Sequence, residues 1–135
     1  MKLFSVSISD RSAQICLFIV RITVSGFMLT HGLPKLNRFM SSEEIKFADP
    51  FGLGPIASLV MVVFAEVFCS ILIIMGLGTR LATIPLMVAM SVAAFSTHAN
   101  DPFATKEKSL LFLLVYIFLF VFGSGRYSID KLNSR

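Results

Sequence analysis

The chain has 135 residues, of which 56% are hydrophobic and 15% are charged, and its formal net charge is +4. Soluble domains carry about 25% charged residues, so this composition excludes an ordinary soluble domain and predicts an integral membrane protein. The length allows one membrane domain over residues 1–135, with about four crossings and short loops. The positive charges are spread over termini and loops, so no nucleic-acid partner is expected. The bilayer is the expected partner.

Residues 13–33 form the first predicted span, which ends where a Gly-Leu-Pro sequence reaches Pro34. Arg21, Ser25, Met28 and Gly32 recur at helical spacing within it. Small residues let helices approach closely, and a charge avoids lipid, so this stripe is predicted to face other helices. The preceding residues lack the apolar core and cleavage site of a signal peptide, so the span is expected to remain in the mature protein.

Three further spans are predicted, over residues 56–78, 81–98 and 107–123. The loop before them, residues 34–55, is rich in turn formers and is expected to be a solvated connector. The glycines of GLGTR end one helix and allow a tight hairpin into the next. The sequence therefore predicts an all-α integral membrane four-helix bundle.

Glu66 and Arg21 are the charges that lie deepest in the predicted spans. A bare charge near the bilayer midplane costs several kcal/mol, so each needs a partner. If antiparallel neighbours place their midpoints at one depth, Arg21 and Glu66 form an intramembrane ion pair, for which a guanidinium is well suited. Two roles are open for this pair: it fixes the helix register, or it forms a proton or quinone-headgroup site.

Several ionisable residues are predicted to share the membrane edge away from the termini, because the first and third spans end there and the fourth begins there. They are His31, Lys35, His98 and Glu107, beside Asn100 and Asp101. Imidazole and carboxylate groups suit a quinone headgroup and its protons near neutral pH. We therefore predict a ligand site between the first, third and fourth spans, with a merely solvated rim as the alternative. No metal site is predicted, since no HxxxH or ExxH spacing places two ligands on one helix.

Arg126 and Asp130 belong to the polar tail that follows the fourth span. They stand four residues apart and could pair with each other on a helical turn. The favoured interpretation is that they anchor the tail, through Arg126, to lipid phosphates or to the hairpin at residues 78–80. Cys16 and Cys69 are isolated and far apart, so both are expected to be inert packing residues.

An even number of crossings places both termini on one side of the membrane. That side carries Lys2, Arg11, Arg80, Arg126, Lys131 and Arg135, and the other carries Lys35, Arg38, Lys46, Lys106 and Lys108. The small excess of positive residues on the terminal side favours cytoplasmic termini in a multi-pass protein of the inner (cell) membrane.

Four sequence features together resemble the DoxX family of small bacterial membrane proteins over residues 13–132. They are a span with Arg21 followed by HGLPKL, a span with Glu66 running into GLGTRLA, a span ending in His98, and GSGRYSID after the last span. Ser124 stands where the family often has proline. The resemblance implies a four-helix membrane bundle. It also implies a quinone as cofactor and a soluble or membrane redox partner, because the family name derives from a subunit of a thiosulfate:quinone oxidoreductase.

The leading functional hypothesis is a redox-linked membrane subunit that binds a quinone within the bundle. A non-catalytic scaffold or chaperone-like subunit is the first alternative, because the sequence has no paired cysteines, haem motif or nucleotide-binding glycine loop. A small transporter of an anion or lipid-like molecule is the second, with Arg21 as its binding charge. Whether the chain is itself an enzyme stays open among these hypotheses.

Overall fold

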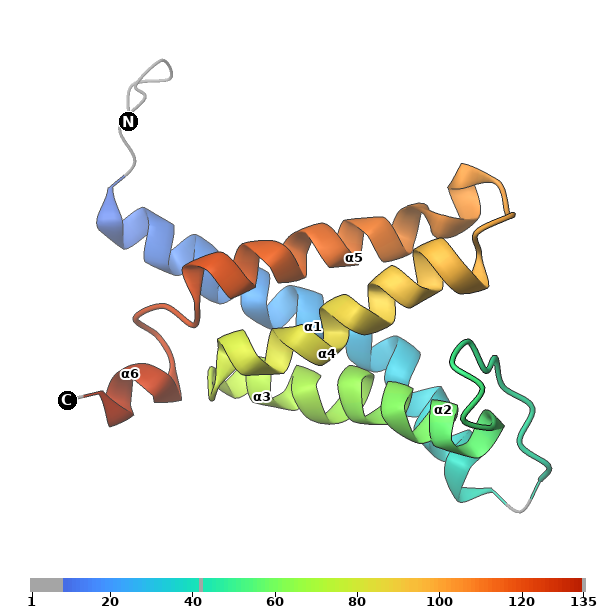
Figure 1. The fold of residues 1–135 in the computed structure, drawn as a ribbon. Coiled ribbons are helices and arrows are strands. Elements are labelled where there is room, and N and C mark those ends of the chain that lie inside the picture. Colours follow the sequence, from blue (N-terminus) through green and yellow to red (C-terminus); the bar gives the residue numbers. More distant parts are fainter. Residues whose placement is uncertain (1–8, 42, 135) are drawn as a thin grey trace.

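A computed structural model describes residues 9–41 and 43–134, and within these ranges the chain is helical and contains no strand (Figure 1). Three of the described helices are long and apolar enough to cross a membrane: Asp10–Met40, Pro55–Met75 and Thr79–Thr97. The predicted all-α membrane fold is confirmed.

Helix α1 runs from Asp10 to Met40 and is 31 residues long. The Ser9 side chain caps its start by accepting a hydrogen bond from the Ser12 amide at 3.2 Å. The predicted end near Pro34 is wrong, because the helix continues for more than a turn beyond it. Pro34 lacks the amide hydrogen that would reach the carbonyl of Thr30, a loss of one bond that membrane helices tolerate.

The second span is one continuous rod with a change of winding in its middle. It consists of α2 (Pro55–Val63), the π-helical segment η1 (Phe64–Cys69) and α3 (Ser70–Met75). Pro55 stands at its start, where a missing amide hydrogen costs nothing. Gly76 ends it with φ +69°, the left-handed conformation that favours glycine.

The third span follows the hairpin at once, as α4 (Thr79–Val92) and a second π-helical segment, η2 (Ala93–Thr97). Helix α5 (Phe103–Phe122) then returns along α4, and the short helix α6 (Ile129–Asn133) ends the described chain. Helix α5 does not count among the apolar spans, because Lys106, Glu107 and Lys108 stand in its first turns. A crossing by residues 107–123 therefore stays a prediction.

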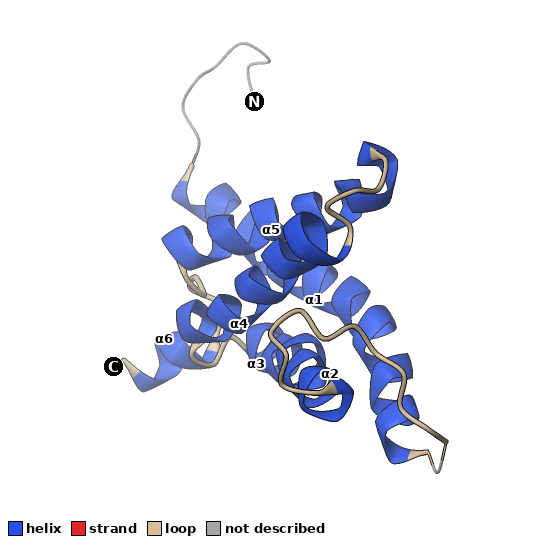
Figure 2. Ribbon diagram, turned by 45° about the vertical axis from the view of Figure 1, so that its right-hand side comes forward, coloured by secondary structure: helices blue, strands red, loops and turns tan. Residues whose placement is uncertain are grey.

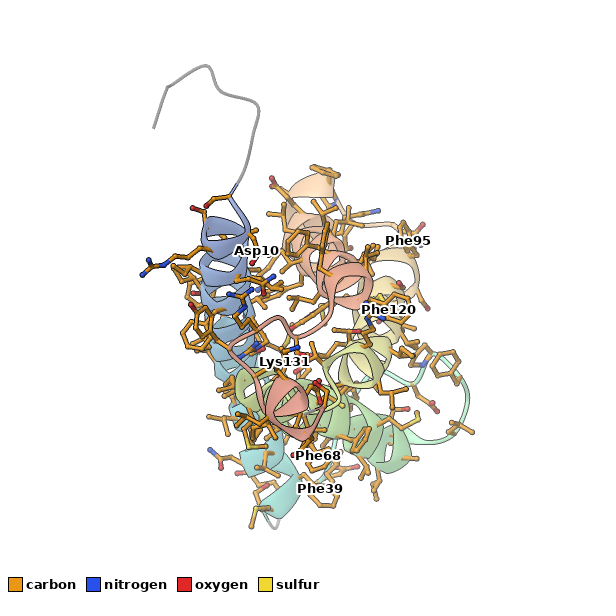
Figure 3. The ribbon with its side chains drawn as sticks, turned by 90° about the vertical axis from the view of Figure 1, so that its left-hand side faces the viewer. Asp10, Phe39, Phe68, Phe95, Phe120 and Lys131 are labelled. Atoms are coloured by element: carbon orange, nitrogen blue, oxygen red, sulfur yellow. The ribbon has the colours of Figure 1, made fainter. Side chains whose placement is uncertain are left out.

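The four rods pack closely at the end that carries the Gly76–Thr79 hairpin and diverge toward the opposite end (Figures 1 and 2). Their buried core contains apolar side chains from every rod: Leu17, Val24, Met28, Ala65, Cys69, Ile73, Ala82, Leu86, Met90, Tyr116 and Leu119. Large apolar side chains, among them Phe39, Phe68, Phe95 and Phe120, lie on the outside (Figure 3). Such an exterior suits contact with lipid.

At Gly32, α1 approaches the second span closely. A Cβ atom at this glycine would lie 2.8 Å from Cγ2 of Val67 and 2.9 Å from Cβ of Glu66. Only glycine fits here, as is usual where membrane helices touch through their backbones. This contact fixes the register of α1 against η1.

Candidate functional site

Glu66 forms its ion pair with Lys35. The Lys35 Nζ atom donates to both carboxylate oxygens of Glu66, at 2.8 and 2.7 Å. Glu66 is only 3% exposed, whereas the Lys35 side chain is 28% exposed, so the pair is buried at its acidic end and reachable at its basic end. The predicted ion pair between Arg21 and Glu66 is therefore wrong.

The register of the helices explains why Glu66 pairs with Lys35 and not with Arg21. Gly32 lies against Glu66, whereas Arg21 reaches the carbonyl of Ile74, eight residues after Glu66. Eight residues correspond to about 12 Å along a helix. Matching the midpoints of the apolar runs failed because α1 extends through Pro34, so that Gly32 and Lys35, and not Arg21, lie at the level of Glu66.

Arg21 is 1% exposed, and its hydrogen bonds among the described residues all go to backbone carbonyls, while its guanidinium also lies over the Phe18 ring, 5.4 Å from the ring centroid. Its guanidinium donates to the carbonyls of Ser124 and of Tyr127, the latter at 2.7 Å, and reaches that of Ile74 at 3.5 Å. These acceptors belong to the tail and to the last turn of α3. Arg21 is therefore a structural residue that joins three segments.

The tail packs against the hairpin, as expected, but through Asp130. Its carboxylate accepts hydrogen bonds from the amides of Gly78 at 2.8 Å and Thr79 at 3.3 Å, and its own amide donates to the Gly76 carbonyl at 2.9 Å. A carboxylate at the N-terminus of α4 also complements the helix dipole. Arg126, predicted to be the anchor, instead pairs with Asp10 at 2.7 Å and fastens the tail to α1.

A cavity of about 690 Å³ lies between the second and third spans. Lys35, Glu66 and His98 line it, but His31 and Glu107 do not. This cavity differs from the predicted site between the first, third and fourth spans, and of that site's expected members it contains only Lys35 and His98. His31 instead packs edge-on against Phe112, with ring centroids 5.9 Å apart.

The walls of this cavity are apolar and include both π-helical segments. The apolar lining residues of the two spans are Val60, Met61, Val62, Phe64, Ala65, Ile84, Pro85, Val88, Ala89, Val92 and Ala93. A π turn inserts an extra residue into a helix and is often found at functional sites. Here η1 carries Glu66, and η2 leads directly into His98. A π turn leaves no periodic pattern in the sequence, so neither segment could be predicted from it.

His98 is held by a neighbouring carboxylate. Its Nδ1 atom lies 2.7 Å from Oδ2 of Asp101. Within the described chain, Nε2 of His98 has no hydrogen-bond partner, and the residue lines the cavity. A carboxylate on one ring nitrogen fixes the orientation of the imidazole and leaves the other nitrogen available to a ligand.

A loop containing Phe47, Ala48, Pro50 and Phe51 closes one side of the cavity, and Asp49 holds this loop in place. The Asp49 carboxylate accepts hydrogen bonds from the amides of Leu53 and Gly54, each at 2.9 Å, and from the Ser58 hydroxyl at 3.0 Å. These hydrogen bonds lower the pKa of Asp49 below its ordinary value, and the bond from the Gly54 amide has the largest effect. The turn formers of residues 34–55 predict a connector here, but they do not identify Asp49 as the residue that anchors it.

Asp49→Ala is expected to loosen this loop at neutral pH, and acid is expected to loosen the wild-type loop. Because the folded-state pKa of Asp49 is lowered, its contribution is fully present above about pH 4 and is lost as the pH falls through the folded pKa. Hydrogen exchange at the Leu53 and Gly54 amides measures the loosening. Asp101→Ala is the control, and equal protection in Asp49→Ala and the wild type would contradict the anchoring role.

Comparison with known proteins agrees with this architecture. The DoxX family profile matches residues 16–99. The chain belongs to the DoxX family. It is also similar to two uncharacterized proteins of Haemophilus influenzae, one 26% identical over 87% of this chain and 83% of the relative, the other 30% identical over 83% and 86%. No solved structure matches the chain.

Proposed function

We propose that this DoxX protein is the membrane subunit of a quinone-linked redox complex and that it binds a quinone in the cavity between α2 and α4. The observation that carries the proposal is the cavity itself, which combines apolar walls with Lys35, Glu66 and His98. Ligand sites are commonly cavities of about 300–1,000 Å³ with mainly apolar walls and a few polar groups that orient the ligand.

The residues present fit such a ligand. An oxidised quinone ring offers two carbonyl oxygens that accept hydrogen bonds, and its isoprenoid tail is apolar. Two of the three Nζ hydrogens of Lys35 are used by Glu66, so one remains for a carbonyl oxygen. The Nε2 atom of His98 is the second candidate contact. The apolar walls along α2 and α4 suit the tail.

In this proposal the chain's own residues bind the ring. A bound quinone supplies two-electron, two-proton redox chemistry, and a partner protein exchanges the electrons. The imidazole of His98 is oriented by Asp101, which leaves its Nε2 atom to hydrogen-bond the quinone ring. The Glu66 carboxylate balances the charge of Lys35, so the cavity carries no uncompensated charge from this pair.

The transporter hypothesis is less well supported than the quinone hypothesis, because its binding residue lies outside the cavity. Arg21 was its binding charge, but Arg21 does not line the cavity and is engaged with carbonyls of α3 and the tail. The scaffold hypothesis differs from the proposal in one respect that can be measured, since a scaffold has no need to bind a quinone.

Binding of a short-chain ubiquinone analogue to the purified protein in detergent tests the proposal. His98→Ala is expected to weaken binding about two- to tenfold, the usual effect of losing one hydrogen bond. Isothermal titration calorimetry suits the measurement, since the chain contains no tryptophan to report by fluorescence.

His31→Ala is the matched control, because it removes the same side chain outside the cavity. It should leave the affinity unchanged. No binding by the wild-type protein would contradict the proposed function and favour the scaffold. Equal loss in the two histidine variants would contradict the placement of the ring beside His98.

A further inference from the structure

A second, smaller hollow lies at the hairpin end of the bundle, away from the main cavity. Its volume is about 300 Å³. It is formed by Gly78 and the first residues of α4, by Phe122 at the end of α5 and the three residues that follow it, and by Asp130. We propose that this hollow binds the phosphate group of a membrane phospholipid. The inference is independent of any quinone.

Arg80 supplies the charge for this site. Its side chain is exposed, and one nitrogen, Nη2, donates to the carbonyl of Val121 at 3.1 Å. Among the described residues it forms no ion pair with a carboxylate. Its guanidinium lies against Gly123, since a Cβ atom there would be 3.2 Å from Nε of Arg80. Arginine held in this way keeps further N–H groups for the two-pronged binding that phosphate favours.

Ser124 and Gly125 also line the hollow. The amides of Ser124 and Gly125 donate no hydrogen bond within the described part of the chain. The Asp130 carboxylate also belongs to the wall, but both of its oxygens already accept amides of the α4 N-terminus. Its negative charge is therefore compensated by the helix end, and the Arg80 charge stays available to an anion.

The surroundings favour a lipid over a free anion. Leu81 is 75% exposed and Phe122 is 61% exposed, and both line the hollow. They stand where α4 begins and α5 ends, so a phosphate bound by Arg80 would place its acyl chains along these two apolar side chains. Arginine at such a helix end commonly reaches the headgroup region.

The test uses purified, delipidated protein in detergent with dioctanoyl phosphatidylglycerol, observed by native mass spectrometry. The wild type is expected to retain the lipid and not dioctanoylglycerol, which has the same chains without the phosphate. Arg80→Gln is expected to lower the retained fraction at least about fivefold, and Arg80→Lys less, because a lysine keeps the charge but not the planar fork. Arg11→Gln, an exposed arginine of α1 outside the hollow, is the matched control.

Each contrary outcome has a definite meaning. Equal retention by Arg80→Gln and the wild type, or equal loss in Arg11→Gln, would overturn the site. Retention of dioctanoylglycerol at the same level would overturn the role of the phosphate. Displacement of the lipid by an equal concentration of inorganic phosphate would overturn the lipid and leave a free-anion site. Thermal unfolding of Arg80→Lys and Arg80→Gln checks that both variants are folded.

Discussion

Arg21→Ala is expected to lower the free energy of unfolding by about 3 kcal/mol or more, because it strands buried carbonyls that a charged donor now satisfies. The carbonyls of Ser124 and Tyr127 accept from this guanidinium, and the side chain is 1% exposed. Thermal unfolding in detergent measures the effect. Limited proteolysis should also cut the tail after residue 123 more readily, since the tail then keeps only the hydrogen bonds of Arg126 to Asp10 and Gln14 as polar links to α1 in the described chain.

Two further variants separate charge from geometry. Arg21→Lys keeps a positive charge but cannot fork between carbonyls of the tail and of α3, so it is expected to restore only part of the stability. Arg11→Ala removes an exposed arginine from the same helix and should change stability by less than about 0.5 kcal/mol. A variant Arg21→Ala as stable as Arg11→Ala would show that the carbonyls find other partners.

The same arginine shows how far sequence reasoning reaches. Composition and apolar run lengths predicted an all-helical membrane fold, and the glycines of GLGTR predicted the hairpin, because these features depend on local chemistry. Partner choice depends on the register between helices. That register includes the close contact of Gly32 with Glu66 and the passage of α1 through Pro34, neither of which periodicity reveals.

The sequence predicted only part of the candidate site, because the register between helices also decides which side chains meet there. Lys35 and His98 were expected at a ligand site, and both line the cavity. His31 and Glu107 were included because they stand at the same membrane edge, but an edge does not specify the direction of a side chain. Glu66 was assigned to the core and in fact joins the cavity through Lys35, which a turn of α1 beyond Gly32 brings within reach.

Gly32→Ala is expected to destabilise the bundle by about 1–3 kcal/mol, the usual cost of forcing extra volume into a packed interior. The added methyl would meet Val67 at 2.8 Å and both the side chain and the backbone of Glu66 at 2.9 and 3.0 Å. Backbone cannot move aside as a flexible side chain can. The expected response is a separation of α1 from η1, which also lengthens the Lys35–Glu66 contact. Thermal unfolding and quinone-analogue binding measure the two consequences.

Gly26→Ala is the matched control on the same helix, since a Cβ atom there meets nothing within 4 Å. It should leave stability unchanged or slightly raised. The double variant Gly32→Ala with Val67→Ala removes the nearest clashing atom, so it should lose less than the sum of the two single changes. It should not recover fully, because the Glu66 backbone remains in the way. Equal stability of Gly32→Ala and Gly26→Ala would mean that α1 and η1 do not touch at this glycine, and the register that brings Lys35 to Glu66 would then need another cause.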